Sequence, residues 1–465
     1  MTRWLYSWLM WLAQPLLRRK LMRRSRQESG YGQAVGERFG HYTQPVPGHD
    51  GPTLWIHAVS LGETRAAAVL VAALREQLPK MRLLLTHGTA TGRAEGVKLL
   101  AAGDLQAWQP WDTPGAVQRF LMHFKPSLGI LMETEIWPNL VAGCQQMGVP
   151  LVLANARLSD KSMRQAQRLA WLARPAFAAL AAVWAQTPLD AQRLQAMGAK
   201  VQGVLGNLKF DAAPNADQLA LGWRWRAQLA QPVVMFASSR AGEELALLKI
   251  LKSFMPLAFV DHTQIAIDSV ANKVQWLIVP RHPQRFDAVA ALIESHGFAV
   301  QRRSSWGSGG PAALANDART NPAEVSPGSM LPTIWLGDSL GEMALYYGLA
   351  DVALLGGSFE PLGGQNLIEA AACGCPVVMG PHTFNFLEVA EQALAAGAAM
   401  RVPDLTHGVQ AACDVASNQT EHQMMVQASA RFNEQNRGAV KRTAQMVMQL
   451  LHQHGVDGGQ VISHQ

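Results

Sequence analysis

Acidic residues are missing from the first 26 positions of this 465-residue chain, which carry seven Lys and Arg residues. The whole chain has a net charge of +6, so residues 27–465 together sum to −1. A nucleic-acid-binding body needs a basic face, and this nearly neutral body has no basic stripe. We therefore predict no nucleic-acid partner and assign the basic character to one short N-terminal segment.

Cysteine is also scarce, with four residues (Cys144, Cys373, Cys375 and Cys413) in spacings that match neither a disulfide framework nor a zinc site. We interpret them as buried free thiols of a reducing compartment. Charged residues make up only 16% of the chain and apolar residues 49%, which excludes a largely disordered protein. The length predicts two or three domains.

Three nucleotide-binding signatures are absent from the sequence. There is no G-x-G-x-x-G near the first predicted strand, which disfavours a dinucleotide-dependent oxidoreductase. There is no Walker A motif, which excludes P-loop chemistry. There is no D-x-D pair to hold a metal against a diphosphate. We therefore expect no cofactor and no metal.

An apolar run long enough to span a bilayer is lacking as well. Trp4 to Leu17 is almost wholly apolar, but 14 helical residues extend only about 21 Å, against a hydrocarbon core of ~30 Å. Trp4, Trp8 and Trp11 recur at helical spacing, and basic residues follow at 18–26. Tryptophan and cations suit a membrane interface, so residues 1–26 predict a membrane-anchoring helix with anionic phospholipid headgroups as partners. The alternative is a helix packed on the protein's own core.

From about residue 50, short apolar runs alternate with helical stretches, which is typical of a parallel α/β architecture. Two series of this kind predict two Rossmann-like domains facing across a cleft, at 27–215 and 216–455. The last helical stretch, 438–453, is expected to pack back on the first domain. The predicted strands are 54–59, 82–87, 128–133, 150–155, 182–186 and 201–205 in the first series, and 233–238, 274–280, 333–337, 352–356 and 375–379 in the second.

Two longer helical stretches and two insertions are also predicted. One helical stretch is expected at 160–180 and another at 420–437. The segments 254–272 and 304–330 are read as insertions, because they lengthen connections and carry no obvious chemical constellation.

Three motifs of the first half carry candidate catalytic groups. Glu63 follows a strand and a tight turn, Glu133 directly follows another strand, and Lys209 lies near the domain junction. The carboxyl ends of parallel strands are where α/β sheets bind ligands, so the two acids could converge there. Helix capping is the alternative role for such acids, and a solvated linker position is the alternative for Lys209.

The strongest motif of the second half is Gly356–Glu369, which contains two pairs of glycines. Paired glycines let main-chain N–H groups reach a phosphate, and a helix expected to begin near Gln365 offers its positive end. Glu369, one turn into that helix, is placed to accept hydrogen bonds from ribose hydroxyls. Arg281, after another strand, is suited to hold a phosphate.

Together these motifs resemble those of the 3-deoxy-D-manno-octulosonic acid (Kdo) transferases, glycosyltransferases of the GT-B fold. The resemblance follows the chain in order over nearly its whole length. The segments that carry it are Gly36–Gly40, Trp55–Glu63, Glu133–Pro138, Gly206–Phe210, Pro280–His282, Gly356–Glu369 and Gly380–Phe386.

The resemblance implies transfer of Kdo from CMP-Kdo to a lipid A precursor (lipid IVA), with inversion, on the cytoplasmic side of the inner membrane. It implies Glu63 as the general base, and Glu133 and Lys209 as groups that stabilise the transition state. The positions expected to bind the nucleotide and donor are Pro280, Arg281, Gly341, Glu342, Met343, Gly363, Gly364, Asn366, Leu367, Ile368 and Glu369.

Two other functions are compatible with the isolated motifs. The first is a GT-B glycosyltransferase or an epimerase that uses a UDP-sugar, because the glycine-rich segment alone does not choose the nucleotide. The second is a catalytically inactive, membrane-docked protein that binds a nucleotide sugar. The second predicts that amide substitutions at Glu63 and Glu133 have no effect.

Overall fold

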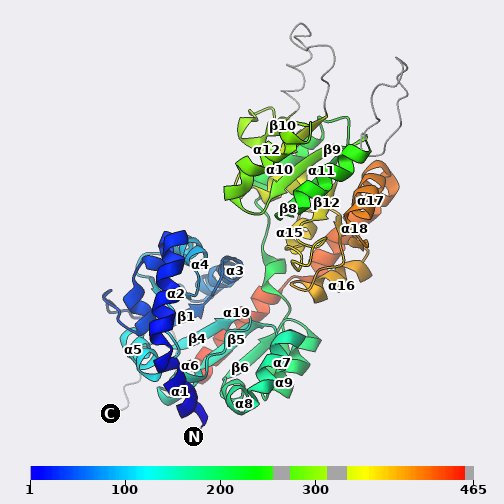
Figure 1. Ribbon diagram of the computed structural model, residues 1–465. Coiled ribbons are helices and arrows are strands. Elements are labelled where there is room, and N and C mark those ends of the chain that lie inside the picture. The colour runs from blue at the N-terminus through cyan, green and yellow to red at the C-terminus, as the bar shows by residue number, and fades with distance from the viewer. Residues whose placement is uncertain (1, 255–272, 312–331, 456–465) are drawn as a thin grey trace, which may run out of the picture. The chain divides into compact units, whose positions relative to one another are not determined.

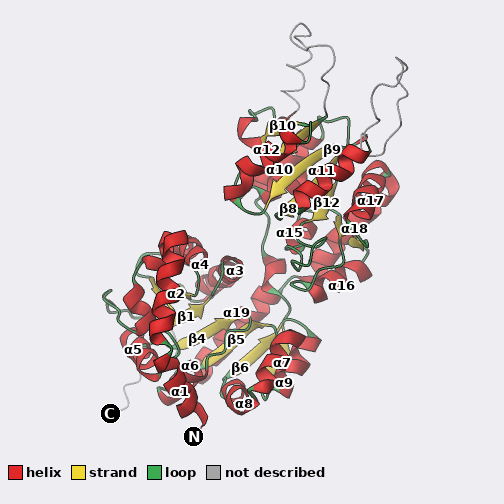
Figure 2. Ribbon diagram, in the orientation of Figure 1, coloured by secondary structure: helices red, strands yellow, loops and turns green. Residues whose placement is uncertain are grey.

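The computed structural model describes residues 2–254, 273–311 and 332–455, and it divides the chain into two compact units. The first unit contains residues 1–212 and 436–465, and the second contains residues 213–435. Figures 1 and 2 show each unit as a sheet covered by helices. The two units are described separately below.

The first unit is built on a seven-stranded sheet whose strands all pair in parallel, in the order β3-β2-β1-β4-β5-β6-β7. Its central strands are buried along their whole length, as expected for a parallel sheet covered on both faces. The strands are β1 (Thr53–His57), β2 (Arg82–His87), β3 (Leu105–Trp108), β4 (Leu128–Met132), β5 (Leu151–Ala156), β6 (Ala182–Ala185) and β7 (Val201–Val204).

Helices cover both faces of this sheet and bury its apolar side chains. One core is formed with α3 and α19, and the other with α5, α6, α8 and α9. The C-terminal helix α19 thus belongs to the first unit. The helices are α1 (Thr2–Leu12), α2 (Gln14–Gln27), α3 (Leu61–Gln77), α4 (Ala90–Gly96), α5 (Pro114–Phe124), α6 (Pro138–Gln146), α7 (Asp160–Arg168), α8 (Ala170–Ala178), α9 (Pro188–Ala196) and α19 (Ala439–Gln453).

The second unit has its own seven-stranded parallel sheet, in the order β10-β11-β9-β8-β12-β13-β14. Helices α11, α12, α17 and α18 contribute to its core. The strands are β8 (Val233–Ser239), β9 (Gln275–Pro280), β10 (Ala299–Arg302), β11 (Thr333–Leu336), β12 (Val352–Leu355), β13 (Val377–Met379) and β14 (Ala399–Arg401). The helices are α10 (Ala216–Arg226), α11 (Glu243–Ser253), α12 (Phe286–Ser295), α14 (Met343–Leu349), α15 (Ile368–Ala372), α16 (Leu387–Ala395), α17 (Leu405–Ser417) and α18 (Gln419–Asn436).

The sequence did not predict three of the strands: β3, β10 and β14. Each lies at the edge of its sheet and is only three or four residues long. An edge strand pairs on one side only, so its sequence does not need the continuous apolar run of a central strand. The helix expected at 160–180 is in fact two, α7 and α8, which meet at Leu169. The expected insertions 254–272 and 304–330 lie largely outside the described residues.

The N-terminal segment forms two helices, because Pro15 stands in the first turn of α2 and a new helix begins there. Trp4, Trp8 and Trp11 of α1 are 72%, 49% and 62% exposed, so this face does not pack on the protein's own core. Within the residues that the structure describes, no helix combines the length and apolar character needed to cross a bilayer.

Candidate active site

In the first unit the strand order reverses at β1, which pairs with β2 on one side and with β4 on the other. Open α/β sheets bind ligands at such a switch point, outside the carboxyl ends of the strands. Glu63 lies in the first turn of α3, directly after β1, and Glu133 directly follows β4. The topology therefore brings both predicted acids to the same edge of the sheet, after adjacent strands.

Glu63 caps its helix and is also a half-buried acid. The N–H of Val59 donates to Glu63 Oε2 at 2.8 Å, the hydroxyl of Ser60 donates to Oε1 at 3.0 Å, and the N–H of Glu63 donates back to Ser60 Oγ at 3.3 Å. The arrangement resembles a capping box, with the N–H of Val59 in place of that of the N-cap Ser60. Burial, and next the negative charge of Glu133, raise the pKa of Glu63 from 4.5 to about 7. A carboxylate that titrates near neutrality is suited to general base catalysis.

Glu133 forms an ion pair with Lys209, with Nζ 2.8 Å from Oε1. The main chain at Glu133 is left-handed, with φ of +60°, a conformation that costs a residue with a Cβ roughly 1–2 kcal/mol. It is held there because its N–H donates to Ala154 O at 3.0 Å and its carbonyl accepts from the N–H of Arg157 at 3.2 Å. Such local strain clusters at functional sites.

Lys209 is held in place by two asparagines. Asn207 Oδ1 accepts the N–H of Lys209 at 3.0 Å, and Asn155 Oδ1 accepts the N–H of Leu208 at 3.0 Å. The Lys209 side chain is 22% exposed and paired with Glu133, so it is not a solvated linker lysine. The three predicted catalytic residues thus belong to one unit.

A cavity of about 280 Å³ lies at the same edge of the first sheet; we call it the α2 cavity, because residues of α2 form part of its wall. Glu135 is part of its wall, and its Oε2 accepts the indole N–H of Trp137 at 2.9 Å. The cavity is lined by Leu17, Lys20, Leu21, Arg24, Tyr31, Arg38, His57, Val59, Gly88, Thr89, Gln109, Pro110, Trp111, Asp112, Glu135 and Trp137.

In the second unit the strand order reverses at β8, between β9 and β12. The loops after β8 and β12 meet there through Glu243, the first residue of α11, which is 1% exposed. Both of its carboxylate oxygens accept the N–H of Gly357 at 2.8 Å, and Oε2 also accepts the N–H of Arg240 at 2.8 Å. Glu243 therefore fixes the first glycine pair to the loop that follows β8.

The glycine-rich loop after β12 requires left-handed main chain at Gly357, Gly363 and Gly364, with φ of +69°, +91° and +75°. A Cβ at Gly363 would lie 2.4 Å from Asn385 Nδ2, so only glycine fits. The expectation of a helix beginning near Gln365 is wrong: α15 begins at Ile368 and has five residues.

The residues between the second glycine pair and α15 form a loop rather than the first turn of a helix. Just before the helix, Asn366 Oδ1 accepts the N–H of Ile368 at 3.2 Å. Glu369 lies in the first turn of α15, not a full turn further. Leu367 and Ile368 are each 1% exposed and pack in the interior. The predicted helix N-terminus at Gln365 is therefore absent from this loop.

The other predicted nucleotide-binding residues follow β9 and β11. Pro280 ends β9, and the N–H of Arg281 donates to Ser239 O at 3.0 Å. Gly341 has φ of +84°, and Glu342 pairs with Arg303 at 2.9 Å just before Met343 begins α14. All lie at or after the carboxyl ends of strands of the second sheet.

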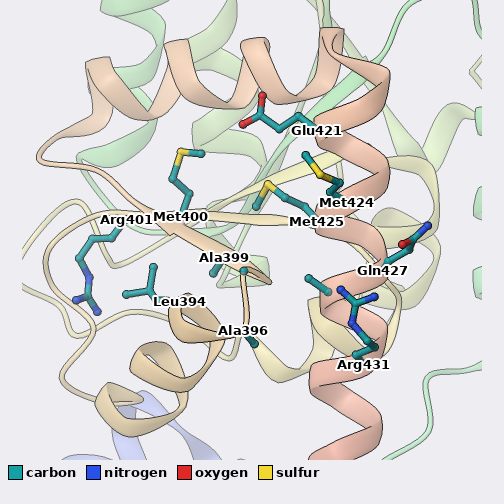
Figure 3. A pocket seen from close by; sticks show the side chains of 12 residues that line it. Leu394, Ala396, Ala399, Met400, Arg401, Glu421, Met424, Met425, Gln427 and Arg431 are labelled. Carbon is teal, nitrogen blue, oxygen red and sulfur yellow. The ribbon is translucent and has the colours of Figure 1, made fainter.

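A larger pocket of about 600 Å³ in the second unit lies elsewhere, at the edge strand β14. Figure 3 shows Met424 and Met425 of α18 across this pocket from Met400. None of the predicted site residues lines it. It is therefore not part of the candidate active site.

Sequence reasoning missed Glu243 as the residue that joins two loops, and it missed Arg38, Asp112 and Glu135 as cavity walls. Glu135 stands in a motif that the sequence did single out, and Arg38 lies in the segment Gly36–Gly40. Their roles depend on contacts with residues distant in the chain, so spacing alone carries no signal for them.

Comparison with known proteins decides the family. A 3-deoxy-D-manno-octulosonic acid transferase from Bordetella pertussis is 43% identical over 436 residues, which cover 92% of this chain and 95% of that protein. The transferase from Haemophilus influenzae is 29% identical and covers 98% of this chain and all of its own length. The family profile "3-Deoxy-D-manno-octulosonic-acid transferase (kdotransferase)" matches residues 33–212.

The chain belongs to the Kdo transferase family. It is therefore an enzyme, a glycosyltransferase that transfers Kdo, a sugar of lipopolysaccharide. The predictions of family, enzyme class and general function are confirmed at this level.

The fold agrees with this membership. A UDP-GlcNAc 2-epimerase from Neisseria meningitidis superposes with a TM-score of 0.53 at 14% identity, covering 86% of this Kdo transferase and all of the epimerase. At that identity the likeness concerns the fold alone. Two parallel seven-stranded α/β units confirm the predicted GT-B class. The four cysteines are free and buried, as predicted.

Proposed function

We propose that this Kdo transferase moves Kdo from CMP-Kdo to a lipid A precursor, lipid IVA, in lipopolysaccharide biosynthesis, with inversion and without a metal. The observation that carries the proposal is the Glu63 carboxylate, with a pKa of about 7, at the switch point beside the Glu133–Lys209 pair. A single base is what an inverting transfer requires.

An acceptor hydroxyl attacks the anomeric carbon of Kdo while Glu63 takes its proton. The new bond joins the acceptor oxygen to that carbon, the bond from the carbon to the CMP phosphate oxygen breaks, and CMP leaves with the electron pair. Glu133 would stabilise positive charge that develops on the sugar, with Lys209 fixing its orientation.

The second unit would bind CMP-Kdo at the carboxyl edge of its sheet. Gly357, Gly363 and Gly364 give the loop after β12 its left-handed turns at the switch point between β8 and β12, and Arg281 directly follows β9, the other neighbour of β8. The guanidinium of Arg281 is suited to the charge of the departing phosphate. We assign the donor site to Pro280, Arg281, Gly341, Glu342, Met343, Gly363, Gly364, Asn366, Leu367, Ile368 and Glu369.

The first 26 residues would hold the enzyme at its acceptor, on the cytoplasmic side of the inner membrane. A lipid A precursor stays in the bilayer, so the enzyme must reach it there. Three exposed tryptophans on α1, followed by the basic helix α2, suit the interface between acyl chains and anionic headgroups.

The test is transfer from CMP-Kdo to tetraacyl lipid A precursor, with the products read by mass. Glu63→Gln should retain CMP binding while kcat falls by about 10²-fold or more. Glu76→Gln, an exposed acid on the same helix α3, is the matched control and should keep its activity. Near-normal turnover by Glu63→Gln would reject Glu63 as the base, and tighter binding of UDP than of CMP would reject the donor.

A further inference from the structure

The main-chain peptide group between Ala58 and Val59 connects Glu63 to the second strand of the first sheet. Its N–H, from Val59, donates to Glu63 Oε2 at 2.8 Å. Its carbonyl, from Ala58, accepts the Nδ1–H of His87, the last residue of β2, at 2.9 Å. One planar peptide group thus lies between the imidazole of His87 and the carboxylate of Glu63.

The neighbours of His87 assign one role to each of its ring nitrogens. A carbonyl only accepts, so Nδ1 carries the hydrogen of the bond to Ala58 O. The side-chain amide nitrogen of Gln106 donates to Arg93 O at 2.8 Å and lies 3.1 Å from His87 Nε2. An amide nitrogen only donates, so Nε2 is the acceptor. Burial lowers the pKa of His87 from 6.5 to about 4, so the ring holds this neutral tautomer at neutral pH.

The position of the His87 ring is fixed by the close approach of α4. His87 is fully buried. A Cβ at Gly96 would lie 2.4 Å from His87 Nε2. A Cβ at Gly92, one turn earlier, would lie 2.9 Å from Val59 O. The helix therefore contacts both the ring and the turn after β1 at glycines, and the imidazole has no room to turn away from the peptide group.

The two carbonyls of the turn after β1 have different donors. Val59 O accepts the hydroxyl of Thr89 at 2.8 Å and its N–H at 3.0 Å. Ala58 O is buried, and among the hydrogen bonds of the described residues it accepts only that of His87. Without this donor, Thr89 still holds the turn, but the Ala58 carbonyl is left buried and unsatisfied, which is unfavourable. The peptide group would then rotate toward another donor, and its N–H would lose its alignment with Glu63.

We propose that His87 is a positioning residue for the general base: it orients and polarises the Ala58–Val59 peptide group, whose N–H stabilises the ionised carboxylate of Glu63. The inference rests on the function proposed above, in which Glu63 is the base. Hydrogen bonds in series strengthen one another, because each one polarises the group that donates next. A donor to the ionised form of an acid lowers its pKa, and the Val59 N–H thus opposes the burial that raises the pKa of Glu63.

Charged and titratable groups lie on both sides of this peptide group. Arg93 of α4 and His57 of β1 are next to His87. Glu133 and Glu135, from the segment after β4, act on Glu63. A substitution of His87 leaves these four groups in place, so a change in the titration of Glu63 reports on the peptide group between them.

The experiment measures kcat/KM for transfer from CMP-Kdo to tetraacyl lipid A precursor as a function of pH in two variants. His87→Asn carries its amide nitrogen on Cγ, as histidine carries Nδ1, and keeps the donor to Ala58 O. His87→Gln places its amide near the position of Nε2 and loses that donor.

We expect His87→Gln to move the midpoint of the ascending limb to higher pH, because the pKa of Glu63 rises when its ionised form loses a donor. Below the midpoint kcat/KM should fall about 3–10-fold, the contribution of part of one hydrogen bond to a charged group. Most of the loss should be recovered at alkaline pH, where Glu63 is ionised in both enzymes. His87→Asn should keep the midpoint of the unaltered enzyme.

His123→Asn is the matched control. His123 is a half-buried histidine of α5 whose Nε2 lies 3.0 Å from Gln44 O, so the substitution removes the same kind of bond elsewhere in the same unit. It should leave the midpoint unchanged, and a shift equal to that of His87→Gln would overturn the proposal. Calorimetry should give equal CMP binding for all three variants, and circular dichroism checks that each is folded.

Two further results would also overturn the positioning role. The first is a uniform loss at every pH in His87→Gln with an unchanged midpoint, which a merely structural role produces. The second is a shifted midpoint in His87→Asn, which also decides the question if His87→Gln does not fold. Glu63→Gln in the same series separates the two proposals. If it loses activity while His87→Gln shows no shift, only the role of His87 is rejected; if it keeps normal turnover, the base is rejected and the role of His87 with it.

Discussion

Replacing Glu133 with Gln should lower the pH at which this Kdo transferase gains activity. The pKa of Glu63 rises from 4.5 to about 7, with burial as the first cause and the charge of Glu133 as the second. The whole rise corresponds to about 3 kcal/mol. Since burial, the largest cause, remains in the variant, we expect the pKa of Glu63 to fall only part of the way back toward 4.5.

The sign of the effect follows from the role of Glu63. A general base works in its ionised form, so activity should increase as the pH rises through its pKa. The ascending limb of kcat/KM should have its midpoint near pH 7 in the unaltered enzyme and at lower pH in Glu133→Gln, even where the maximum rate is reduced. In this variant the positive charge of Lys209 no longer pairs with Glu133, and it should lower the pKa of Glu63 further.

Lys209→Met should shift the midpoint of the pH profile in the opposite direction. It leaves the negative charge of Glu133 without its partner 2.8 Å away, which should raise the midpoint above that of the unaltered enzyme. The assay is the pH profile of kcat/KM for transfer to lipid A precursor, since this limb reports the free enzyme. An unchanged midpoint in both variants, or shifts of the same sign, would refute the coupling of Glu63 to Glu133.

Three further changes test the donor loop and the membrane segment. Gly363→Ala should weaken CMP binding about 10-fold, because the left-handed main chain and the close approach of Asn385 exclude a Cβ; calorimetry measures it. Glu243→Gln should also weaken CMP binding, because it loses the carboxylate that holds Gly357. Replacement of Trp4, Trp8 and Trp11 by Ser should reduce co-sedimentation with anionic vesicles while CMP binding is retained.

Each of these changes has a matched control on the described chain. Gly307→Ala, with no atom within 4 Å of the added Cβ, and Glu294→Gln, an exposed acid on α12, should leave CMP binding unaltered. Trp223→Ser removes an indole that is 55% exposed in the second unit and should not affect vesicle binding. If a control variant loses as much CMP binding or vesicle binding as the test variant that it matches, the specific contact is not the cause of that loss.

Much of the fold was predictable because buried parallel strands need continuous apolar runs. The central strands β1, β4, β8 and β12 are fully or almost fully buried, and each was visible as such a run. The edge strands β3, β10 and β14 were not, because pairing on one side relaxes that demand. The start of α15 was misplaced, because consecutive left-handed glycines delay the helix beyond Gln365.

The sequence alone was enough to indicate the family, the two α/β halves, and the acids and glycines that follow the strands, because strand ends and turns leave local signatures. Tertiary structure decided which of those groups act on one another. Glu63 is coupled to Glu133, and Lys209 is paired with Glu133. The carboxylate of Glu243 binds the N–H of Gly357, and several cations line the α2 cavity. Each of these arrangements joins residues from separate strands and helices. Burial and charge at such a junction are set by the order of strands in the sheet, which residue spacing does not encode.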